Sequence, residues 1–301
     1  MKPVRTAYSD AYYCETPQPS MRKLPLVARL AEQQGYAELV APEPVGRKEL
    51  KSVHHSRYVE SVMTGIGELA ECAFGFWSEA YRDGVLAING GNLLAAKMAL
   101  EEGIAANIGQ GFHHARFKTG AGYCTFNGLA LVAVLNPELQ VLVIDCDEHA
   151  GDGTAELTTM VPNLTNFSIC GSRMGCSESD RSILRHVEPH DVNAYGRYLT
   201  EALEYAASTK PNLVIYQAGM DPHENDPLGR SKMPGEFLKE RDQFVMQTLA
   251  LHLHIPFFFV LAGGYQEPIE DVLVPLHLHT FETAAKVNGK LSQGGGKQSG
   301  Q

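Results

Sequence analysis

The stretch Gln140–Thr154 (QVLVIDCDEHAGDGT) changes from a largely apolar run into a polar run that contains two glycines. Residues 140–145 are short, continuous and apolar, which is typical of a strand buried on both faces. Such strands occur mainly in parallel sheets whose faces are covered by helices. The polar residues then lie at the carboxyl end of the strand, where open parallel sheets bind ligands. The stretch therefore predicts a fold class and a position for the functional site.

The same alternation recurs along the chain and predicts a single α/β domain. Further apolar runs lie at 104–107, 164–170, 212–217 and 256–261. Helical patterns lie near 20–35, 91–103, 126–135, 191–208 and 234–253. Strands that alternate with helices predict a largely parallel central sheet with helices on both faces. We expect this domain to occupy residues 1–289, and residues 290–301, which offer almost nothing apolar to bury, to form a disordered tail.

The composition is that of an acidic globular protein. The 301 residues carry a formal net charge of −10, and 44% of them are hydrophobic, which argues against disorder. An acidic chain is poorly suited to neutralise phosphates, so we expect no direct contact with nucleic acid. The sequence has no apolar run long enough for a bilayer span, no secretory signal and no CxxC pair among its six cysteines. These features predict a cytoplasmic protein with reduced thiols and no membrane partner.

The polar run after the 140–145 strand has the pattern of a metal site. Asp145, Asp147 and His149 alternate, so their side chains lie on one side while the backbone stays extended. A carboxylate and an imidazole with this spacing can bind one cation, and Asp221, after the run at 212–217, is placed to supply a third ligand. Three protein ligands and an open position for water are typical of catalytic zinc. The competing interpretation is a polar turn that binds nothing.

Two further polar clusters follow other predicted strands. His113 and His114 are adjacent, and adjacent histidines can carry protons if a carboxylate holds each ring; Asp145 and Asp152 are available for this. Tyr265 follows two glycines, and its phenol could donate a hydrogen bond to an oxyanion. Taken separately, the histidines are also compatible with an ordinary surface, and the tyrosine with a core position.

Taken together, these motifs resemble the zinc-dependent histone deacetylase family, in the superfamily that includes the acetylpolyamine amidohydrolases. The matching segments occur in the family's order over roughly residues 50–270. They are Val53–Val59, His113–Ala115, Gly122–Cys124, Asp145–Thr154, Asp221–Gly229 and Gly263–Tyr265. The resemblance is closest to compact bacterial members and the class IV-like branch, and it implies the arginase/deacetylase fold.

The resemblance also implies a role for each matching residue. The ligands of the catalytic Zn²⁺ would be Asp147, His149 and Asp221, a set that also admits Fe²⁺, Co²⁺ or Mn²⁺. The proton carriers would be two pairs, His113 with Asp145 and His114 with Asp152, and the residue that polarises the substrate carbonyl would be Tyr265. The tunnel for the lysine stem would be lined by Gly122, Tyr123 and Leu228. A structural K⁺ would be bound with the help of Asp145 and Ser168.

The chain departs from the family pattern at three positions. Ala150 stands where many relatives have a second His or a Gln, Ala262 where a third Gly often occurs, and Glu148 where an apolar residue is common. None of the three removes a ligand, a proton carrier or the tyrosine. They therefore bear on substrate choice and loop geometry.

The activity implied is metal-dependent hydrolysis of an acetyl or other acyl group from the ε-amine of lysine, carried on a protein. One alternative substrate is a small acylated amine such as an acetylpolyamine, because an acidic chain attracts cations. A second alternative is an acyl-lysine binding module that has lost catalysis. A third is a binuclear manganese ureohydrolase of the same fold, which would need further Asp and His ligands.

Overall fold

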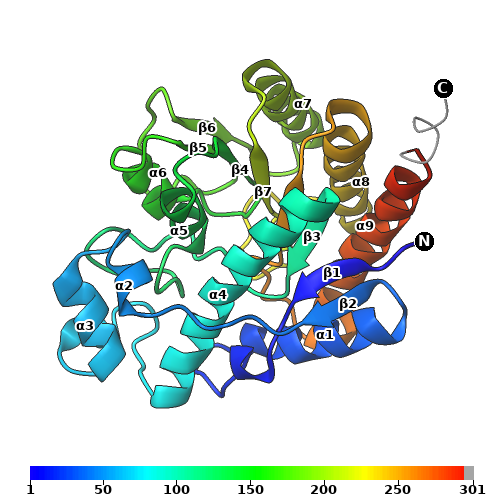
Figure 1. Cartoon of the computed structure of the whole chain (residues 1–301). Coiled ribbons are helices and arrows are strands. Elements are labelled where there is room, and N and C mark those ends of the chain that lie inside the picture. Colours follow the sequence, from blue (N-terminus) through cyan, green and yellow to red (C-terminus); the bar gives the residue numbers. More distant parts are fainter. Residues whose placement is uncertain (295–301) are drawn as a thin grey trace.

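Eight parallel strands form one central sheet in the computed structural model of the chain, which describes residues 1–294 (Figure 1). The strands are β1 (Val4–Ala7), β2 (Ala37–Val40), β3 (Ile104–Asn107), β4 (Val141–Asp145), β5 (Leu164–Cys170), β6 (Ser182–His186), β7 (Leu213–Gln217) and β8 (Phe257–Val260). Their order across the sheet is β2-β1-β3-β8-β7-β4-β5-β6, and every pairing is parallel. The prediction of a single α/β domain with a largely parallel sheet is confirmed.

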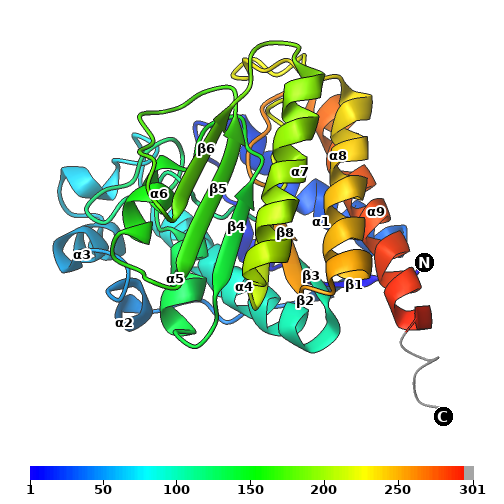
Figure 2. The same cartoon turned by 90° about the horizontal axis from the view of Figure 1, so that it is seen from above.

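Helices cover both faces of this sheet, as Figure 2 shows for α7, α8 and α9 on one side. The helices are α1 (Lys23–Gln33), α2 (Arg47–Leu50), α3 (Ser56–Thr64), α4 (Glu79–Glu102), α5 (Gly128–Leu135), α6 (Asp152–Thr158), α7 (Val192–Thr209), α8 (Gly235–Gln247) and α9 (Val274–Gly294). The long helix α4 packs on β1, β3 and β8, and α5 packs on α4. None of the helices in residues 1–294 is long and apolar enough to cross a membrane.

Local sequence explains where the longest helix begins and ends. The Ser78 hydroxyl accepts a hydrogen bond from the Tyr81 N–H at 3.0 Å and caps the start of α4. Gly103 ends the helix with φ +91°, a backbone conformation that glycine adopts readily and that residues with a Cβ atom rarely adopt. Gly103 leads directly into β3, so this glycine turns the chain from a helix into a central strand.

Three strands were not predicted from the sequence, namely β1, β2 and β6. The strands β2 and β6 lie at the two edges of the sheet, where one side of the strand is unpaired. All three carry a charged residue within the strand, namely Arg5, Glu38 and Arg185. The five predicted strands have no charged residue before their last position. A charge inside a short run removes the pattern that is typical of a strand buried on both faces.

The predicted boundary between domain and tail falls inside α9. This helix continues past Lys290 and ends at Gly294, so the first five residues of the predicted tail are helical. The rest of that tail, residues 295–301, lies outside the described residues.

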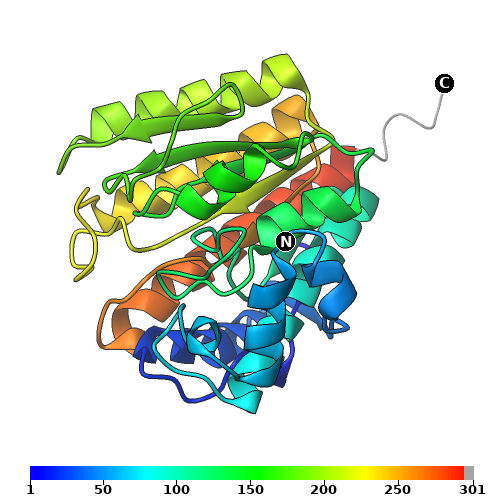
Figure 3. The same ribbon diagram turned by 90° about the vertical axis from the view of Figure 1, so that its left-hand side faces the viewer.

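The order of the strands brings the predicted functional residues to one edge. The four neighbouring strands β3, β8, β7 and β4 are followed by His113, Tyr265, Asp221 and Asp147, respectively. Because the strands are parallel, all four loops leave the sheet at its carboxyl end. Figure 3 shows the loops after β7 and β8, coloured yellow to orange, on the side to which the strands point.

Candidate active site

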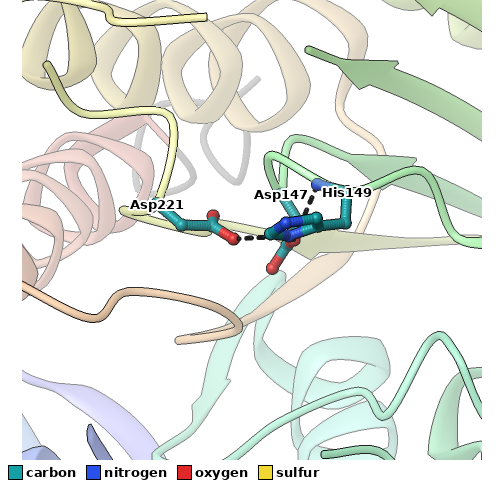
Figure 4. Close-up of side chains that lie close together, drawn as sticks. All are labelled: Asp147, His149 and Asp221. Atoms are coloured by element: carbon teal, nitrogen blue, oxygen red, sulfur yellow. Dashed lines mark hydrogen bonds and ion pairs between the residues drawn. The ribbon is translucent and has the colours of Figure 1, made fainter. Parts of the chain in front are cut away.

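Three side chains from two neighbouring loops form a possible metal centre. Asp147 and His149 follow β4, and Asp221 follows β7, which pairs with β4. One ligand atom from each residue lies within 4.8 Å of the other two. The Nδ1 atom of His149 is 3.3 Å from Oδ1 of Asp147 and 3.2 Å from Oδ2 of Asp221 (Figure 4). The structure thus brings together the three ligands predicted from the sequence.

Backbone N–H groups hold the two carboxylates in this arrangement. The Gly263 N–H donates to Oδ2 of Asp147 at 2.8 Å, and the Glu148 N–H donates to Oδ1 of Asp221 at 3.0 Å. Gly263 is required here, since a Cβ atom at this position would lie 2.3 Å from Asp221 Oδ2 and 2.6 Å from Asp147 Oδ2. The loop after β8 therefore packs directly against the Asp147 and Asp221 side chains, which lie on the loops after β4 and β7.

The electrostatics of the three side chains favour a bound cation. Burial and the nearby Asp147 carboxylate raise the pKa of Asp221. Burial lowers the pKa of His149, but its hydrogen bonds to Asp147 and Asp221 outweigh this and raise the pKa to about 11. Two buried carboxylates thus hold one positive charge between them, which a metal ion can supply in place of the proton. Two carboxylates and one imidazole fit a divalent ion of the zinc type.

Two histidine–carboxylate pairs lie beside this group, as the sequence predicts. The Nδ1–H of His113 donates to Oδ2 of Asp145 at 2.8 Å, and the Nδ1–H of His114 donates to Oδ1 of Asp152 at 2.6 Å. The two rings lie against each other with centroids 3.9 Å apart. Asp145 is buried and also accepts a hydrogen bond from the side chain of Gln217 at 2.9 Å. Each imidazole is therefore oriented through Nδ1 and presents Nε2.

The surroundings push the pKa values of the two histidines apart. Burial lowers the pKa of His113, but the charges of Asp145 and Asp147 outweigh it and raise the pKa to about 9. Burial and the neighbouring His113 charge lower the pKa of His114. His114 is therefore the ring that stays neutral at neutral pH, with Nε2 able to accept a proton.

The remaining predicted residues lie around the same site. A Cβ atom on Gly122 would lie 2.6 Å from Cδ2 of His114, so this glycine packs against the imidazole. The rings of Tyr123 and Tyr265 have centroids 6.0 Å apart. Tyr265 is half-buried, and its N–H donates to the buried Asp226 carboxylate at 2.8 Å. Burial raises the pKa of the Tyr265 phenol, with Asp221 adding to the effect, so the hydroxyl keeps its proton.

Leu228 lies on the loop after β7 and is 42% exposed. The Asp226 carboxylate accepts hydrogen bonds from the N–H groups of Leu228 and Gly229 at 2.9 and 3.2 Å. Since Asp226 also holds Tyr265, one carboxylate joins the Leu228 loop to the Tyr265 loop. On the neighbouring strand β5, Ser168 lies level with Asp145, the last residue of β4, in the strand pairing.

Glu148, which departs from the family pattern, joins the turn at Asp147–His149 to two neighbouring loops. Its carboxylate is buried and accepts from the N–H groups of Arg230 and Ser231 at 2.8 and 3.2 Å, and from the Ser231 hydroxyl. Its carbonyl accepts from the N–H groups of Gly171 and Ser172. Glu148 therefore has a structural task that an apolar residue could not perform. The other departures are local, since Ala150 packs with Cys170 and Leu184, and Ala262 adopts φ +52°.

Sequence reasoning missed several residues that support the site. Arg116 donates to the Asp152 carboxylate, and the buried Lys23 donates to the carbonyl of Ala262 at 2.6 Å. Arg241, on α8, reaches both metal-ligand loops. Arg241 and Lys23 each left a signal, because each shares the helical spacing of a buried apolar face, Arg241 on α8 and Lys23 on α1. A charged residue at such a position demands a partner.

Comparison with known proteins agrees with this geometry. The sequence matches the histone deacetylase domain over residues 16–176 and 183–280. It is 31% identical to histone deacetylase 2 of Arabidopsis thaliana over 274 residues, which cover 82% of this chain and 69% of that protein. It is 23% identical to the acetylpolyamine amidohydrolase of Mycoplana ramosa over 214 residues, which cover 64% of this chain and 60% of that protein.

A solved structure has the same fold. The acetylpolyamine aminohydrolase from Burkholderia pseudomallei superposes with a TM-score of 0.75 and 16% sequence identity, covering 96% of this chain and 99% of that one. The architecture is therefore the arginase/deacetylase fold. The domain match, the identity to a curated relative and the fold together lead to one conclusion: the chain belongs to the histone deacetylase family.

Proposed function

We propose that this chain is a metal-dependent amidohydrolase that removes an acetyl or other acyl group from the ε-amine of lysine or from a similar amine. Its family is one of deacetylases. The observation that carries the proposal is the position of the Asp147–His149–Asp221 group beside the two histidine–carboxylate pairs. Metal ligands and proton carriers at one strand edge are the parts that amide hydrolysis by water requires.

Asp147, His149 and Asp221 would hold Zn²⁺, with Fe²⁺, Co²⁺ and Mn²⁺ also compatible with these ligands. An ion bound there supplies a Lewis acid, which polarises an amide carbonyl and makes water a stronger acid. The pairing of Asp145 with Ser168 also supports a structural K⁺ near those two residues.

His114 would act as the general base. Asp152 holds its Nδ1–H at 2.6 Å, and Arg116 holds the other carboxylate oxygen. The ring is therefore fixed in the tautomer whose Nε2 is free to take the proton of the attacking water. A protonated histidine, His114 or its neighbour His113, would then give a proton to the leaving amine.

Tyr265 would stabilise the oxyanion that forms when water attacks the acyl carbonyl. Burial keeps its hydroxyl protonated, so it is a hydrogen-bond donor. Its loop is fixed by the Asp226 carboxylate on one side and by the Asp147–Gly263 hydrogen bond on the other. Such fixed placement matters because a donor aimed in advance at the oxyanion needs no reorganisation during the reaction.

The substrate would be an acylated lysine on a protein or a small acylated amine. Gly122, Tyr123 and Leu228 would line the passage for the alkyl stem. The relative from Mycoplana ramosa is named for acetylpolyamines and that from Arabidopsis thaliana for histones. The net charge of −10 suits either cationic substrate.

Two other functions are less well supported. Within residues 1–294, the structure brings together one such set of three ligands, whereas a binuclear ureohydrolase needs a second set. A binding module that has lost catalysis has no need for two oriented histidines and Tyr265.

Metal analysis of the purified protein, coupled to hydrolysis of ε-acyl-lysine peptides and acetylated polyamines, tests the proposal. We expect about one divalent ion per chain and deacylation that a chelator abolishes. Two ions per chain would favour the ureohydrolase, and one ion with no turnover on any substrate would favour the binding module.

A further inference from the structure

A buried arginine lies behind the two loops that carry the metal ligands. Arg241 of α8 has its side chain fully buried. Its Nη1 atom donates to the carbonyl of Gly219 at 2.8 Å and to the carbonyl of Cys146 at 3.3 Å. Cys146 directly precedes the ligand Asp147, and Gly219 lies two residues before the ligand Asp221. One nitrogen atom thus joins both loops next to their ligands.

The position of this guanidinium is itself fixed by a buried carboxylate. Oδ1 of Asp242 accepts from Nε of Arg241 at 3.0 Å and from its Nη2 at 2.8 Å. The same carboxylate accepts from the hydroxyls of Tyr216 on β7 and Thr280 on α9, each at 2.6 Å. The arginine is therefore held against the sheet by two other elements. Its remaining nitrogen, Nη1, reaches both loop carbonyls, and Nη2 also lies 3.9 Å from the sulfur of Met220 in the loop after β7.

Other contacts also join the two loops beyond the ends of their strands, and the Glu148 carboxylate reaches the N–H groups of Arg230 and Ser231, far along the loop after β7. The last backbone bond between them runs from the Cys146 N–H to the carbonyl of Gln217 at 3.0 Å. Past that point, the Glu148 N–H donates to Asp221, which is itself a ligand. Arg241 differs from these contacts because it joins the backbone just before both predicted ligands, at Cys146 and Gly219, without using a ligand atom.

We propose that Arg241 is a positioning residue that fixes the separation of the two loops and so the spacing of Asp147 and Asp221. This inference rests on the proposed metal site. A planar guanidinium with a fixed fork can bind Asp242 and two carbonyls at once, whereas a lysine ammonium on a flexible stem cannot reproduce that geometry. Packing alone does not require the charge, because apolar residues of similar volume often replace a buried ion pair without loss of stability.

Co²⁺ binding tests the inference, because the visible spectrum of the ion reports ligand geometry and needs no substrate. Arg241→Lys keeps the charge and loses the fork. We expect its Co²⁺ affinity, measured by competition with a chelator, to fall about 10-fold to 100-fold. We also expect its Co²⁺ spectrum to differ from that of the unmodified protein, while the far-ultraviolet circular dichroism is unchanged.

Thr6→Val is the matched control, since it removes a buried hydrogen bond from the Thr6 hydroxyl to the Val4 carbonyl on β1 and touches neither loop nor Asp242. We expect it to lower the thermal midpoint while Co²⁺ affinity stays within twofold. If Arg241→Lys does not fold, the paired replacement Arg241→Met with Asp242→Leu, which removes both charges together, is measured in the same way.

The outcomes separate this inference from the proposed function. If the unmodified protein binds no Co²⁺, the metal site itself is wrong. If the unmodified protein binds Co²⁺ and the folded arginine variant binds it equally well with the same spectrum, only the positioning role is wrong. Loss of affinity that merely follows loss of thermal stability, in Thr6→Val as in the arginine variant, also overturns it.

Discussion

The adjacent residues His113 and His114 acquire different properties from their surroundings. Both are buried, and both donate Nδ1–H to a carboxylate. His113 also faces Asp147, with Nε2 3.7 Å from its Oδ1, whereas His114 feels the charge of His113. At the scale of single residues, the pKa of each histidine therefore depends on a nearby charge as well as on the carboxylate that accepts its Nδ1–H.

Removing the Tyr265 hydroxyl tests its part in the reaction. Tyr265→Phe should reduce turnover by about 10²- to 10³-fold, because loss of one oxyanion donor typically costs this much. Metal content should stay at the level of the unmodified protein, since the phenol is not among the ligands. Steady-state kinetics with metal analysis check both points, and unchanged turnover would remove Tyr265 from the mechanism.

Removing one carboxylate tests the metal centre. Asp221→Ala should abolish stoichiometric metal binding, because two ligands remain and one of them, Asp147, loses its partner across the site. Elemental analysis after dialysis measures this. Asp180→Ala, which removes an exposed carboxylate elsewhere, should keep its metal. Full retention of metal in Asp221→Ala would reject the ligand assignment.

A histidine outside the site should control stability in acid. His54 is buried, donates Nδ1–H to the carbonyl of Arg116 and accepts the Asn127 N–H at Nε2, each at 2.9 Å. Burial lowers its pKa from 6.5 to about 4. Between these two pH values His54 binds a proton in the unfolded chain but not in the folded chain, so the stability of the fold decreases as the pH drops from 6.5 to 4. The whole effect is about 3 kcal/mol.

Denaturant unfolding at several pH values measures this linkage. In His54→Gln the free energy of unfolding should depend less steeply on pH between 6.5 and 4, by a slope that corresponds to about one proton. The variant should also be less stable than the unmodified protein at pH 7. Thr6→Val provides the control, because it removes a buried hydrogen bond but no ionisable group and should therefore leave the pH dependence unchanged. An unaltered slope in His54→Gln would contradict the assignment.

At the scale of elements, the loops that follow the strands determine the site more than the strands do. The loop after β8 supplies Tyr265 and packs Gly263 against both ligand carboxylates. The loop after β7 supplies Asp221 and is tied to the turn at Asp147–His149 by Glu148. Asp226 then joins these two loops to each other. Each loop is held by polar contacts to the next one, so a change in one displaces its neighbours.

Adding a single methyl group at Gly263 should disturb the metal centre. In Gly263→Ala the Cβ atom would lie 2.3 Å from Asp221 Oδ2, so the loop or the ligand must move. We expect metal affinity to fall at least about 10-fold, measured by chelator competition. An affinity equal to that of the unmodified protein would show that the loop yields without moving the ligands.

Gly196→Ala is the matched control for that substitution. Gly196 lies inside α7, and a Cβ atom there would meet nothing within 4 Å. Metal affinity should be unchanged, and the free energy of unfolding should rise by about 0.5–1 kcal/mol because alanine is the better helix former.

At the scale of the whole molecule, the proposed metal site joins parts of the chain that are far apart in sequence. The three side chains that could hold an ion come from positions 147–221, and the glycine that packs on them is at 263. The loops after β4, β7 and β8 converge there. A bound ion would therefore stabilise the central part of the sheet as a unit.

Loading the protein with Zn²⁺ should raise its thermal stability. Free ion at 100 times the dissociation constant stabilises the folded state by about 2.7 kcal/mol, which corresponds to roughly 5 °C in Tm for a domain of this size. Thermal scans with and without a chelator measure the shift. Equal midpoints for the loaded and chelated protein would contradict binding at a site that joins the loops after β4 and β7.

The sequence by itself determined the residue types and the strands that carry them. Short runs without an internal charge predicted the strands β3, β4, β5, β7 and β8, and polar residues after them predicted the ligands, because parallel sheets bind ligands at the carboxyl ends of their strands. The same reasoning could not find β1, β2 and β6, each of which carries a charged residue within the strand. It also missed Arg116, because no local pattern marks a charge whose partner lies far away in the chain.

Only the tertiary structure decided which loops meet. The order β3-β8-β7-β4 places residues 107 and 257 on neighbouring strands, and nothing local in either segment specifies that neighbour. The physical reason is that parallel strands are joined by long crossovers, so their order depends on how helices pack on the sheet. That packing brought His113, Tyr265, Asp221 and Asp147 to one edge, and it placed Arg241 behind them.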